Sequence, residues 1–356
     1  MRIYGSVSSF YWWKWHAFHI ALGGYQCIYA LFSQGICRVA VPIFFLISGY
    51  LFFINITTWN TNLWLLKLRK RVKTLFIPYV LWVCIAVCLY IVVFCLKAYI
   101  NNDIPDCISW ISERGWWRVF WDNGRYSCTP HTNILGWHIY KALPSNYPLW
   151  FIRDLIILNI ISPLIFCFVR CTQKWGLLIV FVLYVLDIWY PYEGLNGEGF
   201  FFYSLGVYYG VNGLNLVNFC KKYEVVSYII SILLLVCCVL TFYIDGRLLY
   251  RIIRNIFTMS GTISMFCIVS NILAKRKFKT PKLLIESSFF IYTTHTLLIK
   301  DVVIIILSKL IPYTTSIAMI SKYFLTSIMT VSICVLLYVI MKRVAPKILS
   351  VLIGGR

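Results

Sequence analysis

The sequence predicts an all-α, polytopic integral membrane protein with about ten transmembrane helices. Hydrophobic residues make up 61% of the chain and charged residues 13%, whereas an average soluble domain has about 25% charged residues. Long stretches without a charge recur along the chain, and a transmembrane helix needs about 20 such residues. These stretches exceed what one soluble helical core could bury, so a single membrane domain is expected over residues 1–356.

Ten segments are apolar enough to be predicted as membrane spans. In chain order they are 3–22, 39–56, 75–96, 149–169, 175–190, 200–217, 225–244, 256–274, 283–307 and 321–341. The first is the weakest, because it contains Lys14, His16 and His19 and few aliphatic residues. The long polar segment 97–147 separates the third span from the fourth and is expected to form a loop.

Basic residues assign the sides of the membrane, because cytoplasmic loops are enriched in lysine and arginine. We place the basic run 67–73 in the cytoplasm. Alternation of the spans then places the other compact basic loops on the same side: Arg170, Lys174, Lys221, Lys222, Lys275, Arg276, Lys277, Lys279, Lys282, Lys342 and Arg343. The exceptions are Arg247, Arg251 and Arg254, which fall outside. Both termini are therefore expected in the cytoplasm. The protein is expected to be a multi-pass protein of the inner (plasma) membrane.

The same alternation makes 97–147 an extracytoplasmic loop. It is rich in tryptophan: Trp110, Trp116, Trp117, Trp121 and Trp137. Tryptophan is enriched at membrane interfaces, and its ring can also stack on sugars. Both interpretations stay open.

The net charge of +21 arises from 33 Lys and Arg against 12 Asp and Glu. In a soluble protein this excess would suggest a nucleic acid partner. Here cytoplasmic loops explain it, and it can also hold an anionic cofactor or anionic lipid head groups. No nucleic acid partner is predicted.

The 14 cysteines lie mostly inside apolar segments, where cysteine behaves as a small hydrophobic residue. Only Cys107 and Cys128 share the polar loop, so a disulfide between them is an open expectation. No cysteine or histidine pattern has metal-ligand spacing, so no metal site is predicted. The N-terminus lacks the pattern of a cleavable signal peptide.

Ionisable residues inside spans are costly and are functional candidates by default. They are His16 and His19, Arg38, the pair Arg153 and Asp154, Glu286, and His295. The predicted topology places His16, Arg38, Arg153 and His295 near the outer leaflet, as one polar cavity open to the outside would require. Structural alternatives are that Arg153 and Asp154 extend to the interface, that His295 only bonds between helices, and that His19 is a packing residue.

Four sequence blocks resemble the acyltransferase-3 family of integral membrane acyltransferases, which includes surface-polysaccharide O-acetyltransferases. Arg38–Tyr50 (RVAVPIFFLISGY) is similar to the second helix of the family, and Lys70–Tyr79 to the basic segment that follows it. Pro148–Leu155 (PLWFIRDL) and Ser287–His295 (SSFFIYTTH) match two later blocks. The blocks occur in the family's order and extend over nearly the whole chain.

This resemblance implies transfer of an acyl group, most simply acetyl, from cytoplasmic acyl-CoA to a hydroxyl of an extracytoplasmic glycan or lipid-linked sugar. His16 is the best match to the family's histidine and His19 the second. A neutral histidine can remove a hydroxyl proton near neutral pH. Arg38 and Arg153 would hold the donor or stabilise an oxyanion, and His295 completes the catalytic candidates.

The resemblance also suggests that the basic segment binds the donor. Arg69, Lys70, Arg71 and Lys73 would bind the phosphates of CoA from the cytoplasm. A plain topology signal with anionic lipid contact explains the same residues equally well.

Two other functions stay open. The family usually has an arginine eleven residues before its histidine, and here Gly5 takes that place, which fits a degenerate, inactive member. Ten helices with buried arginine and histidine also fit a transporter or flippase of polysaccharides or solutes. Paired inverted halves and matched broken helices would support a transporter, and the sequence has neither.

Overall fold

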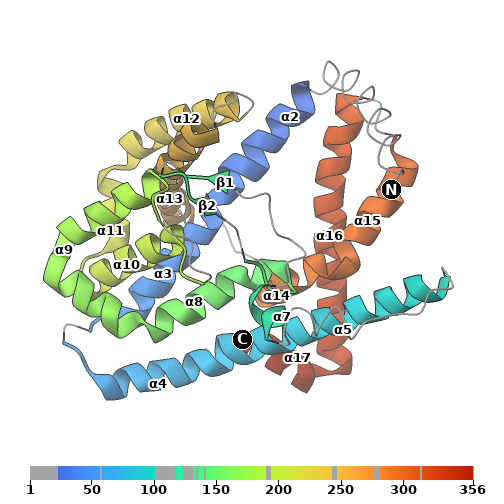
Figure 1. The fold of residues 1–356 in the computed structure, drawn as a ribbon, viewed down its shortest axis with the longest axis horizontal. Coiled ribbons are helices and arrows are strands. Elements are labelled where there is room, and N and C mark those ends of the chain that lie inside the picture. Colours follow the sequence, from blue (N-terminus) through green and yellow to red (C-terminus); the bar gives the residue numbers. More distant parts are fainter. Residues whose placement is uncertain are drawn as a thin grey trace.

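The computed structural model describes residues 23–56, 58–100, 117–122, 131–133, 135–139, 142–189, 194–242, 247–275, 281–312 and 315–355. The helices are α2 (Gly23–Tyr29), α3 (Ala40–Phe53), α4 (Thr61–Arg71), α5 (Ile77–Ile100), α7 (Arg118–Trp121), α8 (Trp150–Ile160), α9 (Ser162–Val185), α10 (Gly197–Val211), α11 (Leu216–Lys222), α12 (Glu224–Thr241), α13 (Arg247–Ala274), α14 (Lys282–Thr294), α15 (Lys300–Leu310), α16 (Ser316–Val344) and α17 (Pro346–Leu352). Short 3₁₀ or π segments adjoin them: η1 (Ala30–Gly35), η2 (Ile36–Val39), η3 (Val72–Phe76), η4 (Tyr147–Leu149) and η5 (His295–Ile299). The arrangement is shown in Figure 1.

The predicted class is confirmed, since the described chain is almost entirely helical. Seven of its helical stretches are long and apolar enough to cross a membrane: Gly23–Phe53, Thr61–Ile100, Ser162–Val185, Glu224–Thr241, Leu248–Ala274, Lys282–Leu310 and Ser316–Val344. The predicted span 3–22 lies outside the described residues. The count of ten spans and the cytoplasmic termini stay predictions.

The second span begins earlier than predicted. The chain is already helical from Gly23, and α2, η1 and η2 lead into α3 without a loop. No proline interrupts residues 23–39, so the helix can continue. A local distortion occurs at Gly35 (φ −103°, ψ −95°). Arg38 therefore lies within a 31-residue helical stretch, so the helix does not begin at residue 39 as predicted, and the place of Arg38 relative to the membrane stays a prediction.

The basic run 67–73 was expected in a loop, and this is also wrong. It lies on α4 and η3, which continue into α5 as a 40-residue helical stretch. Lysine and arginine are good helix formers, so a charged segment need not break the helix. The helix begins at Asn60, whose side chain accepts a hydrogen bond from the Leu63 amide at 3.0 Å. α4 and α5 form the long rod along the lower edge of Figure 1.

The predicted span 149–169 covers α8 and the first part of α9, the predicted span 175–190 overlaps the rest of α9, and the predicted span 200–217 overlaps α10. Ile161 separates α8 from α9, and Pro163 follows in the first turn of α9, where proline is tolerated. Inside α9 the backbone of Gln173 leaves the helical region (φ 51°, ψ −138°), within the predicted connection 170–174. The boundary of these spans was therefore predictable, although the break between α8 and α9 was not.

The core forms where α10 packs against α3 (Figure 1). A β-carbon on Gly49 of α3 would lie 2.3 Å from the Tyr203 carbonyl oxygen, and one on Gly206 of α10 would lie 2.2 Å from that of Leu46. Small residues let helix backbones approach closely in membranes. Gly49 and Gly206 therefore allow the backbones of α3 and α10 to approach closely.

The parts of the 97–147 loop that the structure describes include α7 and two short strands. The strands β1 (His131–Thr132) and β2 (His138–Ile139) pair antiparallel, with His131 opposite Ile139. Cys107 and Cys128 lie outside the described residues, so their disulfide stays a prediction.

Candidate functional site

Three of the blocks that carry the family resemblance meet at one place in the fold. The ring centre of Phe45 on α3 lies 4.8 Å from that of Phe151 on α8, and the ring centre of Phe151 lies 6.5 Å from that of Tyr292 on α14. The Tyr292 hydroxyl donates a hydrogen bond to the Pro148 carbonyl. Side chains far apart in the sequence therefore build one junction.

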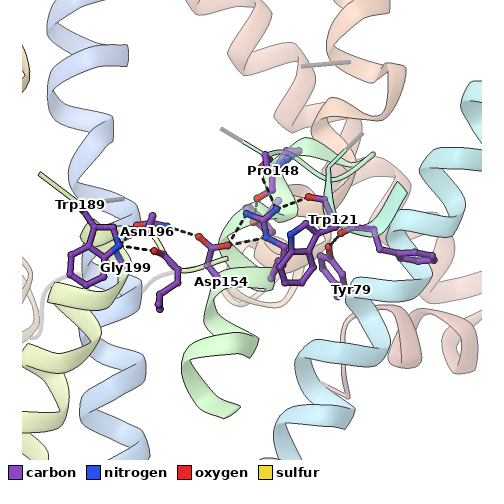
Figure 2. A network of polar contacts seen from close by, with 12 residues as sticks. Tyr79, Trp121, Pro148, Asp154, Trp189, Asn196 and Gly199 are labelled. Atoms are coloured by element: carbon purple, nitrogen blue, oxygen red, sulfur yellow. Dashed lines mark hydrogen bonds and ion pairs between the residues drawn. The ribbon is translucent and has the colours of Figure 1, made fainter. Parts of the chain in front are cut away.

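Arg153 and Asp154 form a buried ion pair at this junction (Figure 2). Nε and NH2 of Arg153 lie 3.0 and 2.9 Å from Oδ1 of Asp154, and the two residues are 5% and 2% exposed. A buried charge is tolerated when it is paired and hydrogen-bonded. The alternative that these residues extend to the membrane interface is therefore wrong.

The remaining contacts of Arg153 hold the polar loop on the bundle. Its NH1 donates to the Trp121 carbonyl at 2.6 Å and to that of Ala142 at 3.1 Å, and its guanidinium lies 5.3 Å from the Trp121 ring centre. The neighbouring Tyr79 hydroxyl donates to the Phe120 carbonyl. Most donors of Arg153 are therefore engaged by the protein, which favours a positioning role for this residue.

Asn196 extends the network to α10. Its side-chain amide donates to Oδ2 of Asp154, and its Oδ1 accepts the Gly199 amide at 2.6 Å. Asparagine is among the preferred residues at this helix-cap position. Figure 2 shows the network reaching from Trp189 through Asn196 and Asp154 to Tyr79. The sequence analysis missed Asn196, although an asparagine before Gly-Glu-Gly at a helix start was an available signal.

His295 lies where α14 ends in the π segment η5. Its Nδ1 is 3.0 Å from the carbonyl oxygens of both Ile291 and Tyr292. A carbonyl only accepts, so Nδ1 carries the proton and Nε2 keeps its lone pair in the neutral ring. Leu298, three residues on, has φ 65°, a conformation that costs about 1–3 kcal/mol and tends to occur at functional sites.

Asn146 fixes this broken helix against the start of α8. It donates to the Thr293 carbonyl at 2.9 Å and accepts from the Thr296 hydroxyl at 3.3 Å. The side chain is fully buried. Asn146, which was not among the residues predicted from the sequence, therefore holds the helix break at His295 in place.

Arg38 is half-buried in η2, away from the ion pair of Arg153. Its NH2 donates to Oε1 of Gln34 at 3.1 Å, and Gln34 donates to the Tyr29 hydroxyl at 3.1 Å. The described structure does not place Arg38, Arg153 and His295 in direct contact. His16 and His19 lie outside the described residues, so their roles stay predictions.

The four basic residues predicted to bind the donor differ in exposure. Arg69, Lys70 and Lys73 are exposed, whereas Arg71 is partly buried and acts electrostatically on Tyr203 in the core. Lys67 turns inward, donates to the Phe52 carbonyl and lies over the Phe52 ring. Three cations therefore face outward on one helical segment.

Glu286 forms an ion pair with Lys342 of α16 at 2.6 Å and a longer one with Lys282. These contacts give Glu286 a structural role between α14 and α16. The described residues contain no group of three or more His, Cys, Asp or Glu that could hold a metal ion.

The fold and this site define a polytopic membrane protein that has buried polar groups around α3. The sequence profile of the acyltransferase-3 family, described as an acyltransferase domain, matches residues 3–339. The chain belongs to this family of membrane acyltransferases.

A curated relative is the succinoglycan biosynthesis protein ExoH of Rhizobium meliloti (strain 1021). It is 23% identical to this chain over 356 residues, which covers 96% of this chain and 86% of the relative. No solved structure matches the chain significantly.

Proposed function

We propose that this protein transfers an acyl group, most simply acetyl, from cytoplasmic acyl-CoA to a hydroxyl of an extracytoplasmic polysaccharide or lipid-linked sugar. The family supports acyl transfer, and the name of the ExoH relative supports a polysaccharide acceptor. One structural observation carries the proposal. Arg38 lies in η2 directly before the 14-residue α3, whereas the exposed cations Arg69, Lys70 and Lys73 lie on α4 and η3, which follow the other end of α3 in the chain.

The donor would bind at the cytoplasmic end. Arg69, Lys70 and Lys73 are exposed on one helical segment, where they can bind the phosphates of CoA. Arg71 is directed inward and would join this site from the core side.

The acceptor would bind at the opposite end. His16 would act as the general base that removes the hydroxyl proton, with His19 as the second candidate. Arg38 would stabilise the developing oxyanion. Nε2 of His295 is available to accept a further hydrogen bond, and Arg153 would hold the loop over the site.

Proteoliposomes test this function. Radiolabelled acyl-CoA is enclosed and the acceptor is added outside. An acyltransferase labels the acceptor covalently, with a label that alkali releases. Movement of solute without covalent label would instead indicate a transporter.

Variants of the first segment test the base. His16→Ala should abolish labelling and His19→Ala should reduce it less, with both proteins inserted at the normal level. Full labelling by His16→Ala would refute the role of His16, and loss with only His19→Ala would transfer that role to His19.

A further inference from the structure

A second polar cluster lies between η2 and α13, apart from the ion pair of Arg153. Arg254 of α13 donates from Nε and NH2 to Oδ1 of Asn255, at 3.3 and 3.1 Å. Its guanidinium lies 5.7 Å from the Tyr250 ring centre. Asn255 is itself fixed, because it donates to the Tyr184 carbonyl at 2.9 Å.

Packing brings Arg38 to the same place. Val39, the next residue, shares an apolar cluster with Phe257 of α13, and Tyr250 packs against this cluster. Aromatic rings also connect the two arginines. The ring centre of Tyr29, whose hydroxyl accepts a hydrogen bond from Gln34, lies 6.3 Å from that of Phe242, which lies 5.4 Å from that of Tyr250. The η2 segment that carries Arg38 packs against α13, where Arg254 lies over Tyr250, and both arginines act electrostatically on Tyr184 and Tyr250, so their charges lie in one region.

The charges in this region are unevenly matched. Arg251 is paired with Asp187 at 3.0 Å. Among the described residues, however, Arg38 and Arg254 bond only to the amides of Gln34 and Asn255. The carboxylate of Glu198 acts on Tyr184 and forms no ion pair in that part of the chain. An arginine has five N–H donors, so most donors of the two arginines have no acceptor among the described residues.

The Tyr250 hydroxyl adds a further available group. Its oxygen is buried and has no hydrogen-bond partner among the described residues. A buried hydroxyl without a partner is unfavourable, and the charges of the two guanidinium groups exceed that of the Glu198 carboxylate, which acts on Tyr184 with them. An oxyanion placed between them would satisfy all three groups.

We propose that Arg38, Arg254 and the Tyr250 hydroxyl bind an anionic group, a phosphate or a carboxylate, carried by the acyl acceptor. Arginine binds both groups with paired N–H donors. This inference deepens the proposed function and rests on it for the identity of the ligand as the acceptor. CoA phosphates are expected at the opposite end of α3, which leaves this site to the acceptor.

The proposal also explains the exception in the charge pattern. Arg251 and Arg254 fall on the predicted outer side, against the rule that basic residues face the cytoplasm. An anion-binding site gives Arg254 a function there, and Arg251 is neutralised by its ion pair with Asp187.

Direct binding tests the site without requiring turnover. The full chain in nanodiscs of zwitterionic lipid is titrated calorimetrically with a sugar 1-phosphate, with a uronic acid, and with the matching neutral sugar. The anionic ligands should bind and the neutral sugar should not. Tighter binding of the phosphate would identify a lipid-linked sugar as the source of the anion, and tighter binding of the uronic acid would identify a charged glycan.

Variants assign the groups. Arg254→Gln should weaken anion binding about 10- to 100-fold, as expected for one hydrogen-bonded charge, and Arg254→Lys should recover part of the loss. Tyr250→Phe should weaken it several-fold without lowering thermal stability, because the hydroxyl has no hydrogen-bond partner among the described residues. Arg343→Gln, at an exposed arginine in the last turn of α16, is the matched control and should bind as the wild type does.

Transfer assays on Arg254 variants then separate anion binding from catalysis, because Arg38 would serve both. Arg254→Gln should raise KM for a charged acceptor with kcat nearly unchanged, and should leave a neutral acceptor unaffected. Equal binding of anionic and neutral sugars, or normal anion binding by both Arg254→Gln and Tyr250→Phe, would overturn the site even if acyl transfer is intact. Anion binding without any acyl transfer would instead refute the proposed function.

Discussion

The backbone of Gly49 lies against the carbonyl of Tyr203, and a β-carbon on Gly49 would be 2.3 Å from that oxygen. Gly49→Ala must therefore push α3 away from α10. Overpacking of this kind typically costs about 1–3 kcal/mol. We expect a lower unfolding temperature in detergent, measured by the loss of the monodisperse peak on heating. Gly23→Ala, where nothing lies within 4 Å, should behave like the wild type.

Asp154→Asn should destabilise the protein strongly. It leaves the buried guanidinium of Arg153 without its counter-charge, and breaking a buried pair costs about 3–5 kcal/mol. Replacing both residues together, as Arg153→Met with Asp154→Leu, should recover much of the stability, because no charge is then left unpaired. Thermal unfolding of the wild type and of both variants checks this. If the single and the double variant were equally stable, the unpaired charge of Arg153 would not account for the loss of stability in Asp154→Asn.

His295→Asn and His295→Gln separate the two ring nitrogens. An asparagine amide can replace the Nδ1–H that bonds to Ile291 and Tyr292, whereas glutamine reaches toward the position of Nε2. If Nε2 takes part in proton transfer, His295→Asn should fold normally and lose about 100-fold or more in kcat. Acyl transfer and thermal unfolding are measured on the same preparations. Full activity of His295→Asn would assign His295 a purely structural role.

Replacing Arg69, Lys70 and Lys73 together by Gln should weaken binding of the acyl-CoA donor and leave the rate of the chemical step unchanged. These side chains are exposed, so stability should change little. The KM for acyl-CoA should rise about 10-fold or more, since each charged contact contributes about 1.5–3 kcal/mol when formed, and its dependence on salt should flatten. An unchanged KM at low salt would leave these residues as a topology signal. Arg71→Gln should also lower stability, because Arg71 is partly buried near Tyr203.

The sequence predicted the membrane class and three of the segments that meet at the junction. It could do so because apolar runs and the blocks around Pro42, Pro148 and His295 are local patterns. The close packing at Gly49 was predictable for the same reason, since small residues in a span indicate close helix contact.

What the sequence could not predict depends on partners distant in the chain. Arg153 and Asp154 are equally compatible with an interface or a buried pair until Trp121, Ala142 and Asn196 are placed around them. Helix ends were also missed, because hydropathy does not distinguish a charged loop from a charged helix. For this reason the hydropathy pattern did not predict that the basic run before α5 and the first turns of α13 are helical.

The continuous stretch from Thr61 to Ile100 has a consequence for the lipid environment. Its 40 helical residues are about 60 Å long, twice the hydrocarbon thickness of about 30 Å. Part of this rod must therefore leave the hydrocarbon, and the charged half around Arg69 and Lys70 is the part that water and head groups accept. Bilayer thickness then sets how far these cations project, so hydrophobic mismatch should tune the affinity for an anionic donor.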